Sequence, residues 1–112
     1  MYKLEYYTGP NGAQPVAEWL DKLDRQKYAV IAAKMVKLQQ AGLELLKTEM
    51  LKSIKGISGL YELRGGQCRV LVYYDKGNDE FAMLHGFLKK KARESHEIDE
   101  GVRLLREYLA NR

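Results

Sequence analysis

Alternation of hydrophobic and polar residues is clearest in the second half of the chain, where it predicts three short strands. The expected ranges are Leu60–Arg64, about Cys68–Asp75 and about Glu80–Lys89. Each range is rich in β-branched and aromatic residues, and short Gly-containing segments connect them, which is the sequence pattern of β-hairpins. The two connections are Gly65-Gly66 and Lys76–Asp79. We therefore expect an antiparallel three-stranded meander.

The residues before the meander predict one strand and two helices. Alternation over Tyr2–Thr8 indicates a strand. Pro15 suits the first turn of a helix, Asp24 suits the cap of a second helix, and Gly42 suits its end. We interpret the two helices as a hairpin. The segment Leu43–Ser58 has no clear period, and we predict an irregular connection with room for a helical turn.

A final helix is expected after the meander, with Ser95 as its cap. Its apolar stripe consists of Ile98, Val102, Leu105 and Leu109. The resulting order, β-α-α-loop-β-β-β-α, is typical of an α+β domain. The N-terminal strand is expected to join the meander, which gives four strands in all. The 112 residues suit one domain spanning positions 1–112.

Composition and charge narrow the functional classes only slightly. The hydrophobic share of 46% is enough for a folded core. The excess of 19 Lys and Arg over 15 Asp and Glu gives a net charge of +4, which permits a polyanionic partner without requiring one. The single cysteine, Cys68, excludes an internal disulfide, and there is no apolar run of membrane-spanning or signal-peptide length. We expect a cytoplasmic protein with no membrane partner.

Alternation along the strands also divides the side chains of the meander between the two faces of the sheet. The apolar residues are expected to pack against helices: Leu63, Val70, Val72, Leu84 and Leu88. The mixed residues share the opposite face: Glu62, Arg64, Arg69, Tyr73, His85 and Lys89. Such a face suits RNA, because Arg and Lys bind phosphates and aromatic rings stack on unpaired bases.

Cleavage of RNA by its own 2′-OH needs a proton acceptor, a proton donor and cations that neutralise the charge on phosphorus. It needs no metal or other cofactor, and we expect none. The general acid and base are left open between His85, whose ordinary pKa is near neutrality, and a lysine crowded by other cations. Each residue also has an ordinary structural interpretation. His85 can be a hydrogen-bonded core residue, and the lysines from Lys89 to Lys91 can be a solvated run.

Two segments carry a resemblance to a known family: GLYELRGGQCRVLVYY and, after a short turn, FAMLHGFLKKKARES. They resemble the RelE superfamily of toxins from type II toxin–antitoxin systems, and most of all its HigB-like, phage-derived branch. The matching motifs are Leu60–Arg64, Arg69-Val70 and Leu84–Lys90. The resemblance extends over essentially the whole chain and implies a RelE-like fold. It also implies a ribosome-dependent mRNA endoribonuclease that inhibits translation and is neutralised by a cognate antitoxin of helix-turn-helix type.

The resemblance further implies the roles of individual residues. Catalytic roles, as phosphate and transition-state contacts or in acid–base work, fall on Arg64, Arg69, Lys89, Lys90 and His96. RNA-binding roles fall on Lys52, Lys55, Lys91 and Arg93, and on Tyr73 and His85, which strand alternation already places on the mixed face; His96 joins His85 and the lysines as a candidate acid or base. The segment Lys91–His96 lacks the tyrosine of many RelE-type toxins, and His96 lies near its place. Two other functions fit the same residues: a non-catalytic RNA- or ribosome-binding module, and a protein-interaction domain.

Overall fold

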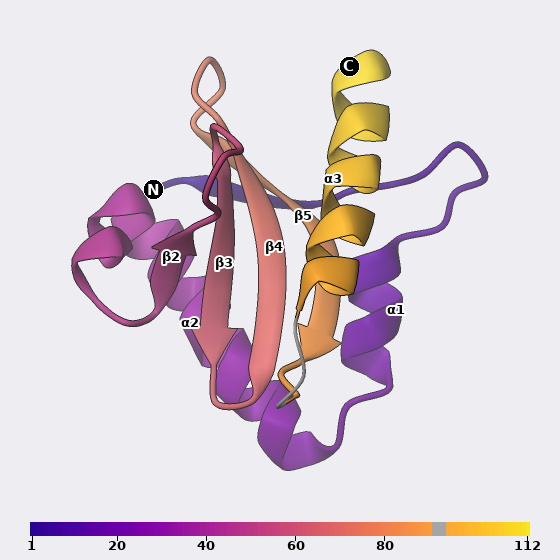
Figure 1. Cartoon of the computed structure of the whole chain (residues 1–112). Helices are drawn as coiled ribbons and strands as arrows, with labels where there is room; N and C mark the ends of the chain where they lie inside the picture. The colour runs from indigo at the N-terminus through magenta and orange to yellow at the C-terminus, as the bar shows by residue number, and fades with distance from the viewer. Residues whose placement is uncertain (91–93) are drawn as a thin grey trace.

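The chain forms one mixed sheet with helices on both faces (Figure 1). The computed structural model describes residues 1–90 and 94–112. Its elements are β1 (Lys3–Tyr6), α1 (Pro15–Asp21), α2 (Arg25–Ala41), the 3-10 helix η1 (Gly42–Lys47), β2 (Leu51–Ser53), β3 (Leu60–Gly65), β4 (Cys68–Asp75), β5 (Glu80–Leu88) and α3 (Ser95–Ala110). None of the described helices is long and apolar enough to cross a membrane.

Within the described residues the sheet has five strands in the order β1-β5-β4-β3-β2. The predicted antiparallel meander of β3, β4 and β5 is confirmed, and β1 pairs in parallel with β5. The expectation of four strands is wrong, because β2 pairs antiparallel with β3 inside the segment predicted as an irregular connection. A strand of three residues is too short to show alternation, and only its partner β3 makes it recognisable.

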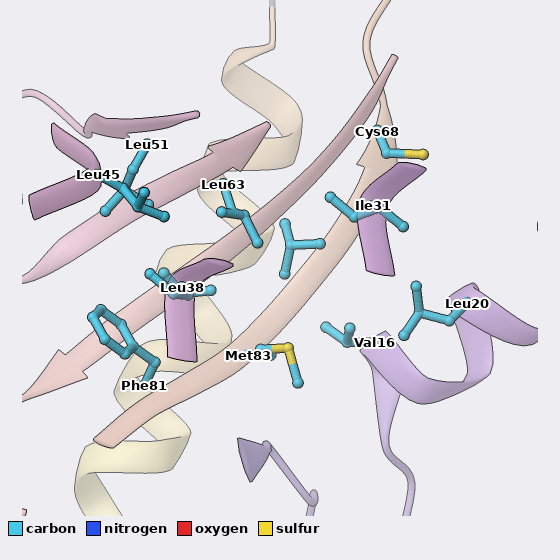
Figure 2. Packing of buried hydrophobic residues seen from close by; sticks show 12 residues of the cluster. Val16, Leu20, Ile31, Leu38, Leu45, Leu51, Leu63, Cys68, Phe81 and Met83 are labelled. Carbon is cyan, nitrogen blue, oxygen red and sulfur yellow. The ribbon is translucent and has the colours of Figure 1, made fainter. Parts of the chain in front are cut away.

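The first face of the sheet packs on α1 and α2, and Figure 2 shows the apolar side chains between them. The cluster includes Ile31 and Leu38 from α2 and Leu63 from β3, all with no exposed surface. The predicted signals at the ends of α2 are confirmed. The Asp24 carboxylate accepts a 2.8 Å hydrogen bond from the Lys27 backbone N–H, and Gly42 ends the helix with a φ of 58°.

The second face packs on α3, which lies across β4 and β5 (Figure 1). Leu71 is fully buried there, and a side chain at Gly101 would collide with it, so the helix backbone lies directly on the strand. The predicted cap is wrong by one residue. Ser95 is the first residue of α3, and the preceding Glu94 makes no side-chain capping bond. The predicted apolar stripe also shifts, because Leu109 is 41% exposed.

A β-bulge changes which residues of β5 face each layer. Leu71 pairs with His85 and Val72 pairs with Met83, so Leu84 is an extra residue between them. Leu84 therefore packs in the α3 cluster, and its predicted place beside Val72 is wrong. The predicted division into a packed face and an open face is wrong as well, because α3 covers part of the second face.

Candidate functional site

Two arginines lie side by side next to the β3–β4 turn, and both form an ion pair with the same buried carboxylate. Arg64 and Arg69 are direct cross-strand partners. Arg64 Nε donates a 2.8 Å hydrogen bond to Glu62 Oε1, and Arg69 Nε lies 3.6 Å from the same oxygen. The Glu62 side chain is only 4% exposed, so little water screens these charges. One carboxylate thus faces two guanidinium groups.

The guanidinium of Arg69 is also held by the backbone of the hairpin. Its Nη1 donates to the carbonyl oxygens of Gly66 at 2.7 Å and Cys68 at 3.0 Å. Its Nε is buried and has no hydrogen-bond partner in the described part of the chain. A buried donor without a partner is uncommon, and it calls for a structural or functional reason.

A cleft of about 380 Å³ opens next to the Arg64 side chain, between β2, β3 and the start of α3. Its lining residues are Lys52, Ser53, Ile54, Lys55, Glu62, Arg64, Glu94, Ser95, Ile98 and Asp99. Lys52 reaches the cleft because its register partner on β3 is Glu62. The structure therefore brings together three predicted site residues, Lys52, Lys55 and Arg64. The cleft combines cations that suit a phosphate with carboxylates that can accept a proton.

The predicted basic segment after β5 begins beside this cleft. The Lys89 backbone N–H donates to the Gln67 carbonyl at 2.7 Å, which ties the end of β5 to the β3–β4 turn. Lys89 Nζ lies 3.4 Å from the carboxylate of Glu94, a residue of the cleft wall. Lys90 follows with an exposed side chain. The predicted RNA-binding residues Lys91 and Arg93 lie outside the described residues.

His85 lies on the same face of the sheet but on the other flank of α3. Lys52, Glu62, Leu71 and His85 form one register row across four strands, and α3 passes over Leu71. His85 Nε2 is 2.8 Å from Glu97 Oε1. Since each helix residue turns by about 100°, Glu97 projects away from the flank whose residues line the cleft. The structure thus ties His85 to α3 and separates it from Arg64.

The structure also keeps two other predicted residues apart from the cleft. Tyr73 pairs with Leu60, at the opposite end of the β3–β4 hairpin from Arg64. Its ring packs at 5.8 Å from that of Tyr108 in α3, within the second core cluster. His96 is exposed in the first turn of α3 and is not among the cleft-lining residues. In residues 1–90 and 94–112, no three His, Cys, Asp or Glu side chains gather as a metal site.

Three residues next to the arginines were not predicted from the sequence. Asp99 and Glu94 line the cleft, and Lys34 of α2 lines a second cavity on the other side of Arg64. The helical repeat places Asp99 on the same side of α3 as Ser95. Only the packing of α3 on the sheet shows that this side borders the cleft. Lys34 carries no signal in the sequence, because it comes from the helix layer on the opposite face of the sheet.

The fold places the chain in a known structural class. It is similar to the archaeal RelE–RelB complex structure from Pyrococcus horikoshii OT3, with a TM-score of 0.62 and 18% identity over 81% of this chain and 98% of that chain. It is also similar to the isolated Escherichia coli RelE toxin, with a TM-score of 0.59 and 15% identity over 91% of this chain and 99% of that chain. The chain therefore has a RelE-like fold, as predicted.

The family follows from the sequence itself. Residues 18–105 match the family described as phage-derived protein Gp49-like. This match spans most of the chain, and the chain belongs to the Gp49-like family. The predicted relation to a phage-derived branch of the RelE superfamily is thereby confirmed. No functionally curated protein has a sequence that matches this chain.

Proposed function

We propose that this chain is the toxin of a type II toxin–antitoxin system and that it cleaves mRNA on the ribosome, which inhibits translation. The observation that carries the proposal is the buried Glu62 that holds Arg64 and Arg69 side by side next to a cleft with Lys52 and Lys55. The RelE-like fold supports it, since the Escherichia coli neighbour is an isolated toxin and the archaeal one is a complex of RelE with RelB. By analogy, we propose a cognate antitoxin as partner, of the helix-turn-helix type that the HigB-like resemblance implies.

In the proposed reaction the scissile phosphate occupies the cleft. The 2′-OH of the preceding nucleotide loses its proton to a base and attacks the phosphorus, and the bond to the 5′-oxygen breaks as an acid protonates that oxygen. The products are a 2′,3′-cyclic phosphate and a free 5′-OH. Arg64 and the lysines neutralise the charge that builds on the phosphate oxygens, which lowers the barrier. Glu62 orients Arg64 through the 2.8 Å hydrogen bond to Nε. Both proton transfers are assigned to lysines at the cleft or at its rim, Lys52, Lys55 or Lys89, in preference to His96, which does not line the cleft.

The proposal is tested with Arg64→Ala. Arg64 is half-buried and its removal leaves Arg69 beside Glu62, so the protein should fold. We expect the variant to lose growth arrest on expression and to cleave mRNA on translating ribosomes about 100- to 1,000-fold more slowly. Arg106→Ala is the matched control, since Arg106 is exposed on α3 and does not line the cleft. A folded Arg64→Ala protein that cleaves and arrests growth like the wild type would refute the proposal.

A second function, a non-catalytic RNA- or ribosome-binding module, is favoured by one observation. None of the described residues that line the cleft is a histidine or a tyrosine. The same cations would then only bind phosphates. The two functions differ in the products, because only the toxin yields cut mRNA at the ribosome. If the wild type binds ribosomes in a salt-dependent way but produces no cut mRNA, the non-catalytic binding module is the correct function.

A further inference from the structure

A second cavity of about 380 Å³ adjoins Arg64 on the side away from the cleft. Its lining residues are Lys34, Glu49, Met50, Arg64, Gly66 and Arg69. Three of the six are cationic. The only carboxylate among these described lining residues, Glu49, lies 3.3 Å from Lys52 Nζ and is thus shared with a lysine of the cleft. The cavity therefore carries an excess of positive charge.

Lys34 reaches this cavity through a close contact between α2 and β3. A side chain at Gly65 would place its Cβ 3.0 Å from Lys34 Cγ and 3.1 Å from Ile31 Cα. Because Gly65 has no side chain, the aliphatic part of Lys34 packs over the strand, and Lys34 lines the cavity together with Gly66 and the two arginines. Within the described residues no carboxylate forms an ion pair with Lys34.

The arginine pair is not neutralised by the protein. Glu62 supplies one negative charge for the guanidinium groups of Arg64 and Arg69, and Arg69 Nε lacks a hydrogen-bond partner at 92% residue burial. Lys34 adds a third cation to the lining of the second cavity, whose own carboxylate, Glu49, is exposed and pairs with Lys52. Like charges held this close repel one another. A bound anion would reduce this repulsion.

We propose that Lys34, Arg64 and Arg69 form a second phosphate subsite, which binds another backbone phosphate of the RNA strand that occupies the cleft. Arg64 lines both cavities and so lies between the two phosphates. A strand with regularly repeated phosphates suits two adjacent cationic cavities that share one residue. The inference rests on the proposed function for the identity of the strand, and it adds Lys34 as a positioning residue for the substrate.

The test measures binding of a six-nucleotide 2′-O-methyl oligouridine to the full chain over a range of salt concentrations. The probe has backbone phosphates but no free 2′-OH, so it binds without being cut. Lys34→Met keeps the aliphatic packing on Gly65 and removes the charge. We expect its affinity to fall about fivefold, which corresponds to about 1 kcal/mol. We also expect the salt slope to become shallower by about 0.7. Lys34→Arg should restore both values, and thermal melting confirms that each variant folds.

Lys37→Met is the matched control, because Lys37 is exposed on the same helix and does not line the cavity. An equal loss in Lys37→Met, an unchanged slope in Lys34→Met, or no binding by the wild type would each overturn the subsite. If Lys34→Met binds the oligonucleotide normally but binds ribosomes less tightly, the phosphate belongs to ribosomal RNA and the assignment to the substrate strand fails. The proposed function is judged separately, by mRNA cleavage in Arg64→Ala.

Discussion

Glu62→Gln tests whether the buried carboxylate organises the arginine pair. The substitution keeps the shape of the side chain and one oxygen that can accept from Arg64 Nε. It removes the charge that balances Arg69, whose side chain is only 10% exposed. Breaking a buried ion pair on one side costs about 3–5 kcal/mol. Because the amide oxygen is retained, we expect a loss near the lower end, about 3 kcal/mol, and a melting temperature lower by about 13 °C.

Thermal unfolding followed by circular dichroism measures this loss. Glu44→Gln is the control, since the exposed ion pair of Glu44 with Lys47 should contribute little. The double variant Glu62→Gln with Arg69→Met removes the uncompensated cation as well, so it should be clearly more stable than the sum of the single losses predicts. A melting temperature within about 2 °C of the wild type, or additive losses in the double variant, would refute the electrostatic account.

Two further predictions concern the α3 layer. Burial, and then the 2.7 Å hydrogen bond to Glu107, raise the pKa of Tyr7 to about 12. The folded state therefore favours the neutral phenol, and its stabilisation is present below the ordinary pKa of about 10 and lost as pH rises through 12. Over this pH range the melting temperature of Tyr7→Phe should fall less steeply than that of the wild type. An equal fall in the two proteins would contradict the assignment. His85→Gln should leave mRNA cleavage within about threefold of the wild type, because His85 faces Glu97 across α3 from the cleft. A loss of about 100-fold or more, the size of a general acid–base contribution, would instead place His85 in the reaction.

The sites that sequence reasoning located best are those set by local connections. Arg64 and Arg69 become neighbours because a two-residue turn joins their strands. The turn is Gly66-Gln67, one residue later than the predicted Gly65-Gly66, and this register makes the two arginines direct partners. Lys52 joins them only through β2, a strand of three residues that has no recognisable pattern of its own. Lys34 enters from the opposite layer, and its position depends on the close packing of α2 on Gly65.

His85 and its neighbour Leu84 show how a packed helix and a β-bulge change an interpretation based on alternation. Alternation places His85 with Arg64 and Arg69 on one face, and the register of β4 with β5 agrees. The β-bulge at Leu84 nevertheless exchanges the faces of the residues before it, which a strict period of two cannot show. Gly101 then lets α3 pass directly over Leu71, and the helix separates His85 from the cleft.

Local patterns in the sequence were sufficient to predict the α+β class, the family resemblance and the approximate limits of most elements. These depend on signals within a few residues, such as Pro15 at the start of α1, Asp24 as a cap and the glycine-containing hairpin turns. Three features became visible only in the folded chain: the fifth strand, the flank of α3 that borders the cleft, and the burial of Glu62. Each of these depends on residues far apart in the chain, where packing and desolvation outweigh local preference.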